Sequence, residues 1–124
     1  MEVFTFLHRL LGQVYLVGGA VRDVLRGVAP KDLDFATPLP PAAVGEAFRG
    51  ADLPLNLRGL EHGMVATVLD GVEVEVATFR VDVAPDGRRA QVAFTASLEA
   101  DLARRDVTIN AMALSVDGEV FDPF

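Results

Sequence analysis

The sequence contains no cysteine, so disulfide bridges and thiolate metal sites are excluded and a cytoplasmic location is expected. It also contains no apolar run long enough to span a bilayer, and its first residues lack the basic start and the cleavage site of a signal peptide. No low-complexity tract stands out. With 51% hydrophobic and 23% charged residues, the chain is expected to form an ordered globular protein.

Basic residues are scarce, because 11 lysines and arginines stand against 18 aspartates and glutamates, giving a formal net charge of −7. Neutralisation of phosphates by basic side chains dominates affinity for nucleic acids. The excess of acidic residues therefore argues against a surface that binds a polynucleotide tightly by itself. The 124 residues suffice for one domain with a sizeable core. Any polynucleotide partner is therefore expected to be held mostly elsewhere.

The functional prediction depends on residues 14–37, VYLVGGAVRDVLRGVAPKDLDFAT. Val14 to Val17 is a short apolar run, Gly18 and Gly19 follow it, and Ala20 to Arg26 has helical character. This order predicts a strand, a tight turn and a helix. Glycines let a backbone come close to an anion, and the start of a helix offers N–H groups to phosphate. The turn is therefore a predicted phosphate site.

A second strand is predicted to carry Asp32 and Asp34. Residues two apart in a strand lie on one face, so the two carboxylates converge while Leu33 and Phe35 turn toward the core. Two carboxylates held this close repel each other unless a cation sits between them, and oxygen ligands suit Mg²⁺. The combination predicts a metal–triphosphate site, although a plain turn and a solvated acidic pair would explain each part alone.

The rest of the chain predicts short helices and strands, which together indicate an α+β domain with a mixed sheet and helices packed against one face. The expected elements are helices at Glu2–Leu11, Pro41–Arg49 and Ser97–Arg105, a strand at Leu53–Leu57, a hairpin of Met64–Asp70 and Val72–Phe79, and a last hairpin of Met112–Val116 and Glu119–Phe121. The first helix is expected to bury Val3, Phe6, Leu7, Leu10 and Leu11. Residues 80–92, RVDVAPDGRRAQV, are turn-rich and predict a loop.

In the strand at Val72–Phe79, valines alternate with Glu73 and Glu75, so one face is apolar and the other acidic. Taken alone, the pattern favours a half-exposed sheet whose outer face happens to carry acid. Two arginines in the following loop, Arg88 and Arg89, could meet a phosphate, but an exposed solvated pair explains them as well.

Three strings in order, GGAVRD, KDLDFAT and DLARRDVTINAMA, resemble the head domain of the bacterial tRNA nucleotidyltransferases (CCA-adding enzymes) and of their poly(A) polymerase relatives. The resemblance runs from about Val14 to Phe124. It implies a nucleotidyltransferase head fold for residues 1–124, with the neck, body and tail domains of the family outside this chain. Because the chain ends at FDPF, it is expected to be a truncated or isolated head domain.

The resemblance also implies residue roles. Asp32 and Asp34 would hold two Mg²⁺ ions, and Glu75, which precedes a TFR-like step at Thr78–Arg80, would be a third active-site carboxylate that supports or deprotonates the attacking hydroxyl. The implied nucleotide-binding residues are Gly18, Gly19, Arg22, Arg105, Asp106 and Asn110, with Arg104 as a further candidate for the triphosphate.

The implied activity is template-independent transfer of C and A nucleotides from CTP and ATP to the 3′ end of tRNA. The base-selecting residues of the family lie beyond Phe124, so CC addition, A addition and poly(A) addition are alternatives. A nucleotidyltransferase for a small molecule or a protein is a further alternative, and so is a catalytically silent nucleotide-binding module. The isolated domain is expected to show weak activity or none.

Overall fold

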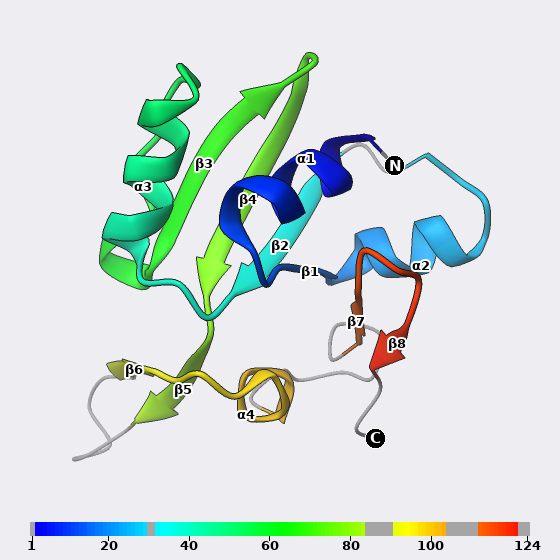
Figure 1. Ribbon diagram of the computed structural model, residues 1–124. Helices are drawn as coiled ribbons and strands as arrows, with labels where there is room; N and C mark the ends of the chain where they lie inside the picture. The colour runs from blue at the N-terminus through cyan, green and yellow to red at the C-terminus, as the bar shows by residue number, and fades with distance from the viewer. Residues whose placement is uncertain (1, 30–31, 84–90, 104–111, 122–124) are drawn as a thin grey trace.

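A six-stranded mixed sheet lies at the centre of the molecule (Figure 1). The structure, a computed structural model, describes residues 2–29, 32–83, 91–103 and 112–121. The strands of this sheet are β1 (Tyr15–Val17), β2 (Leu33–Thr37), β3 (Met64–Leu69), β4 (Val72–Thr78), β7 (Ala113–Leu114) and β8 (Val120–Phe121). Their order is β3-β4-β2-β1-β7-β8, in which β2 and β4 run parallel and the other neighbours antiparallel.

Helices and a small second sheet surround the central sheet. The helices are α1 (Glu2–Leu11), α2 (Gly19–Leu25), α3 (Pro41–Gly50), α4 (Leu98–Ala103) and the short 3₁₀ helix η1 (Leu60–His62). The second sheet pairs β5 (Arg80–Val83) with β6 (Gln91–Phe94) in antiparallel fashion. The predicted α+β class with a mixed sheet is confirmed.

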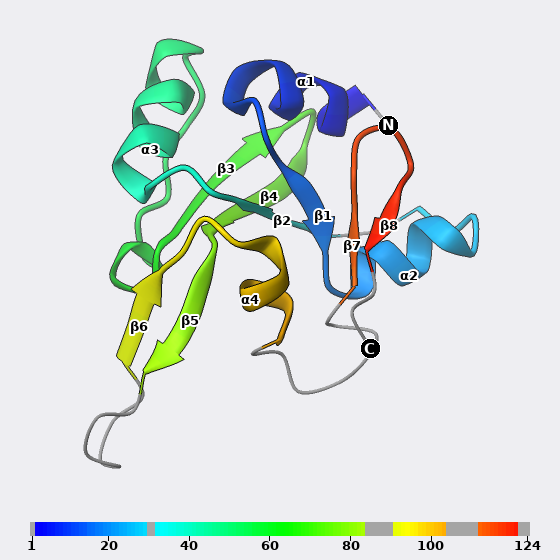
Figure 2. The same cartoon turned by 60° about the horizontal axis from the view of Figure 1, so that its bottom comes forward.

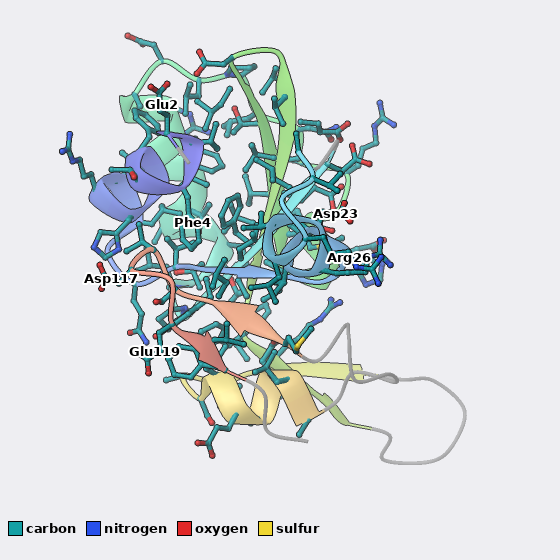
Figure 3. The ribbon with its side chains drawn as sticks, turned by 90° about the vertical axis from the view of Figure 1, so that its right-hand side faces the viewer. Glu2, Phe4, Asp23, Arg26, Asp117 and Glu119 are labelled. Carbon is teal, nitrogen blue, oxygen red and sulfur yellow. The ribbon has the colours of Figure 1, made fainter. Side chains whose placement is uncertain are left out.

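The larger core lies between one face of the sheet and the helices α1, α2 and α3. Its buried members include Leu7 on α1, Val21 on α2, Phe48 on α3 and Phe35 on β2. The ring of Phe4 meets the ring of Phe35 edge to face, with centroids 5.1 Å apart. In Figure 3, Phe4 points from α1 into the interior, whereas Glu2 on the same helix points away from it.

The opposite face of the sheet carries a smaller core. Leu102 of α4 packs there against Val17, Ala36, Phe79 and Ala113. Figure 2 shows α4 and the β5–β6 pair on the side of the molecule away from α1 and α3. Since α4 covers only part of this second face, the acidic side chains of β2 and β4 lie on a face that still has accessible hollows.

Most predicted elements are found where the sequence places them. The helix over Glu2–Leu11, the hairpin of β3 and β4, and the terminal hairpin of β7 and β8 are confirmed. Ser97 caps α4, because its Oγ accepts the backbone N–H of Ala100 at 3.1 Å.

Three local predictions are wrong. Leu53–Leu57 is not a strand: Pro54 has no N–H to donate, and in this described stretch Asn56 alone pairs, in an isolated bridge with Ala66. The predicted loop over 80–92 contains β5 and the start of β6 at its two ends. On α1, Phe4 is buried in place of Phe6, which is 40% exposed.

None of the described helices is long and apolar enough to cross a membrane.

Candidate active site

The centre of the candidate site is a pair of carboxylates on neighbouring strands. Asp34 on β2 and Glu75 on β4 are register partners in the parallel pair, and adjacent strands lie about 4.8 Å apart. The residues on either side of Asp34, Leu33 and Phe35, are buried in the larger core. Alternation along the strands therefore puts both carboxylates on the opposite face, with Asp34 exposed and Glu75 half-buried.

Asp32 lies one residue before β2 begins, so it is not part of the strand itself. It nevertheless lines the same hollow of about 260 Å³ as Asp34, Glu73 and Glu75. The structure therefore brings the two aspartates to one hollow, although only Asp34 lies in the strand that was predicted to carry both.

Crowding of negative charge distinguishes this hollow. Burial raises the pKa of Glu75 above its ordinary value of 4.5, and the charge of Asp34 and a side-chain hydrogen bond with Asp34 raise it further. The charges of Glu73 and Asp32 add smaller effects in the same direction. A bound cation would relieve this repulsion, since an opposite charge favours the ionised carboxylates.

The donor chemistry fits a hard divalent cation, because the polar side chains around the hollow are carboxylates. Among the described residues, no three or more acidic or histidine side chains are arranged to hold a metal ion by themselves. Mg²⁺ is commonly bound through one or two carboxylates together with water and substrate phosphates. The residues present therefore fit a metal that binds together with a nucleotide.

The glycine turn adjoins this pair. Gly18 has φ +74° and ψ −153°, a backbone conformation that is essentially restricted to glycine. A Cβ atom placed on Gly18 would lie 3.8 Å from Oδ2 of Asp34. Gly18 is also the N-cap of α2, so this turn leads directly into the first turn of the helix, where the N–H of Val21 donates to the carbonyl oxygen of Gly18 at 3.1 Å.

Arg22 on α2 supplies positive charge next to this turn. Its Nη2 lies 3.6 Å from the place that a Cβ of Gly19 would occupy, and its Nε makes an exposed ion pair of 3.3 Å with Asp23. Gly19, Arg22, Asp32 and Asp34 all line a hollow of about 340 Å³. The structure thus brings one predicted arginine to the predicted glycines and aspartates.

Arg105, Asp106 and Asn110 lie outside the described residues, as do Arg104, Arg88 and Arg89.

The sequence prediction missed two residues beside the site, Arg80 and Asp101. Arg80 lines a hollow of about 220 Å³ together with Asp34 and Glu75. Asp101 on α4 is 1% exposed and accepts the backbone N–H of Arg80 at 2.9 Å. A signal for Asp101 does exist in the sequence, because it shares a helix face with Leu98 and Leu102 at the i, i+3 and i, i+4 spacing.

The family model described as the poly A polymerase head domain matches residues 14–124. The chain belongs to this family. Nucleotidyltransferases of this kind typically use divalent metal ions, in agreement with the all-oxygen donor set of this head domain.

Among curated relatives, the head domain is 45% identical over 113 residues to the human mitochondrial CCA tRNA nucleotidyltransferase 1. That match covers 90% of this chain and 26% of the relative. The chain thus spans about a quarter of the length of this relative.

Two solved structures share the fold. One is the CCA-adding enzyme of Bacillus stearothermophilus in complex with CTP, with a TM-score of 0.77 and 40% identity over 99% of this chain and 28% of that chain. The other is a tRNA nucleotidyltransferase complexed with a primer tRNA and an incoming ATP analog, with a TM-score of 0.68 and 31% identity over 95% of this chain and 33% of that chain.

Proposed function

We propose that this chain is the catalytic head of a template-independent tRNA nucleotidyltransferase that adds C and A nucleotides from CTP and ATP to the 3′ end of tRNA. The observation that carries this proposal is the juxtaposition of Asp34 and Glu75 in one register, beside the Gly18 turn. The names of the relatives support the choice of substrates, since they include a CCA tRNA nucleotidyltransferase and a CCA-adding enzyme with bound CTP.

The triphosphate would lie in the hollow between α2 and the aspartates. Backbone N–H groups at Gly18 and Gly19 would bind its oxygens, and Arg22 would neutralise part of its charge. From the sequence, Arg105, Asp106 and Asn110 complete the proposed nucleotide site.

Asp32 and Asp34 would hold two Mg²⁺ ions, the number used in a two-metal displacement. Bound metal would supply positive charge at the transferred phosphoryl group and at the leaving pyrophosphate. By holding the metal, the aspartates would also help to position the nucleotide.

The reaction is an in-line displacement. The 3′-oxygen of the acceptor RNA forms a bond to the α-phosphorus of the nucleotide, the bond from that phosphorus to the pyrophosphate oxygen breaks, and pyrophosphate leaves. The proton of the attacking hydroxyl passes to Glu75 or to water beside it. The register pairing of Glu75 with Asp34 supports this role, because it puts the Glu75 carboxylate next to the proposed metal site.

The tRNA itself would be held mostly by other domains. The chain carries a net charge of −7 and spans 26% of the human relative, so neck, body and tail domains beyond it are part of the proposal. A cytoplasmic location stays a prediction.

Poly(A) addition is the second candidate function, because the matching family model is described as a poly A polymerase head domain. CC-adding and A-adding enzymes would use the same carboxylates. A silent nucleotide-binding module would bind CTP or ATP without turnover.

The test is to incubate the complete protein that contains this chain with tRNA lacking its 3′ end, offering one labelled nucleotide at a time. Incorporation of both CTP and ATP to a defined length supports CCA addition, and long A tails support poly(A) addition. Asp32→Ala and Asp34→Ala should each abolish transfer while the protein still unfolds cooperatively. Robust incorporation by either variant would overturn the assignment of the metal site.

A further inference from the structure

Arg80 occupies a junction between three segments near the carboxylate pair. It is the first residue of β5 and follows directly after the strand that carries Glu75. Its Nη1 donates a hydrogen bond of 2.6 Å to the carbonyl oxygen of His62, at the end of η1. Its backbone N–H donates to the carboxylate of the buried Asp101 at 2.9 Å. These two bonds fix both the backbone and the side chain of Arg80.

Arg80 lines a hollow of about 220 Å³ on the sheet face. The hollow has two carboxylates, Asp34 and Glu75, and an apolar wall to which Val17, Met64 and Ala77 contribute. Apolar surface next to carboxylates and a guanidinium suits a sugar or base that continues into a charged phosphate. Among the described residues around this hollow, Arg80 is the cation.

This hollow and the hollow of the proposed triphosphate site meet at Asp34. Among the described residues, Asp34 is the one residue that lines both the Arg80 hollow and the hollow that contains Gly19 and Arg22. In an in-line displacement the attacking and leaving oxygens lie on opposite sides of the phosphorus. If the pyrophosphate leaves on the side of Arg22, the attacking 3′-oxygen approaches from the hollow that contains Glu75 and Arg80.

The electrostatic potential in this hollow is unfavourable for the end of an RNA chain. Its phosphodiester backbone is anionic, and Glu75 already lies beside Asp34 with Glu73 and Asp32 nearby. A fixed positive charge in the hollow lowers the electrostatic cost of bringing two sets of negative charges together. We propose that Arg80 positions the 3′-terminal ribonucleotide of the acceptor RNA against Glu75, by placing its charge beside the last phosphodiester. This inference rests on the proposed function.

The test compares Arg80→Gln and Arg80→Lys with the wild type, in the complete protein that contains this chain, by steady-state incorporation of CTP into tRNA lacking its 3′ end. In Arg80→Gln we expect the KM for tRNA to rise about tenfold, as for the loss of one charge-assisted contact, with the KM for CTP unchanged. The salt dependence of the KM for tRNA should become shallower by about one charge. Arg80→Lys keeps the charge and should recover most of the affinity for tRNA.

The matched control is Arg49→Gln, which removes an exposed arginine on α3, next to the larger core. It should change neither KM. A glutamine at 80 keeps the backbone N–H for Asp101 and a side-chain donor for His62, and a urea unfolding curve identifies any variant that is merely unstable. An unchanged KM for tRNA, a rise in the KM for CTP instead, or an unchanged salt slope overturns the inference. A wild-type protein without any incorporation overturns the proposed function, which is a different outcome.

Discussion

Asp34 and Glu75 are side by side on the parallel strands β2 and β4, although α3, η1 and β3 separate them along the chain. Like charges placed directly opposite each other destabilise a sheet. The folded protein tolerates this arrangement at the cost of a more easily protonated Glu75. The same crowding that weakens the fold at neutral pH is what a divalent cation and a nucleotide would relieve.

The first prediction concerns the repulsion between the carboxylates of Asp34 and Glu75. Because the pKa of Glu75 is raised in the folded protein, the folded state binds more protons than the unfolded state between the ordinary value of 4.5 and the raised value. The free energy of unfolding of the wild type therefore falls as pH rises through this window. Glu75→Gln removes the titration, so the variant should be more stable than the wild type at neutral pH, with the difference shrinking in acid. Urea unfolding at several pH values measures it.

The control for this prediction is Glu46→Gln on α3, where the glutamate is exposed. It should leave the pH dependence of unfolding as in the wild type. A Glu75→Gln variant that is less stable than the wild type at neutral pH would show that the contacts of the Glu75 carboxylate outweigh the repulsion.

Local patterns in the sequence were enough to predict one half of this site. Asp34 lies between the apolar Leu33 and Phe35, so strand periodicity, which is a property of adjacent residues, is enough to place its carboxylate on the face opposite the larger core. The same is true of Gly18, where a tight turn between a strand and a helix needs a residue without a side chain.

The other half of the site depends on pairing between distant segments. Nothing in the periodicity of β4 specifies that it pairs in parallel with β2, so the proximity of Glu75 to Asp34 came from a family resemblance and not from the spacing. The burial of Asp101 also escaped prediction. A carboxylate in the first turn of a helix is usually a solvated partner of the helix dipole, whereas here it accepts the N–H of Arg80 from another segment.

The second prediction concerns the glycine turn. Gly18→Ala should lower the free energy of unfolding by roughly 1–3 kcal/mol, because its φ of +74° and ψ of −153° are strained for any residue with a Cβ. The new methyl would lie 3.8 Å from the Asp34 carboxylate, an ordinary contact, so the cost comes from the backbone. Urea unfolding measures the change, and the KM for CTP should rise if the turn binds the triphosphate.

Gly45→Ala is the matched control for that substitution. Gly45 lies inside α3, and a Cβ placed there would meet no atom of its surroundings within 4 Å. Because alanine favours a helix over glycine, this variant should be more stable by up to about 1 kcal/mol. Equal losses of stability in both variants would refute the claim that the Gly18 turn is specially strained.

The third prediction concerns the anchor between α4 and β5. Asp101 is 1% exposed and accepts the backbone N–H of Arg80, so Asp101→Ala leaves that buried donor without this acceptor. We expect a loss of about 1–3 kcal/mol in the free energy of unfolding. Asp101→Asn should lose less, because an amide oxygen can still accept the N–H, and this comparison separates the hydrogen bond from the charge. Urea unfolding of both variants gives the two values, and an alanine variant as stable as the wild type would show that α4 is held to the sheet by Leu102 and its apolar neighbours alone.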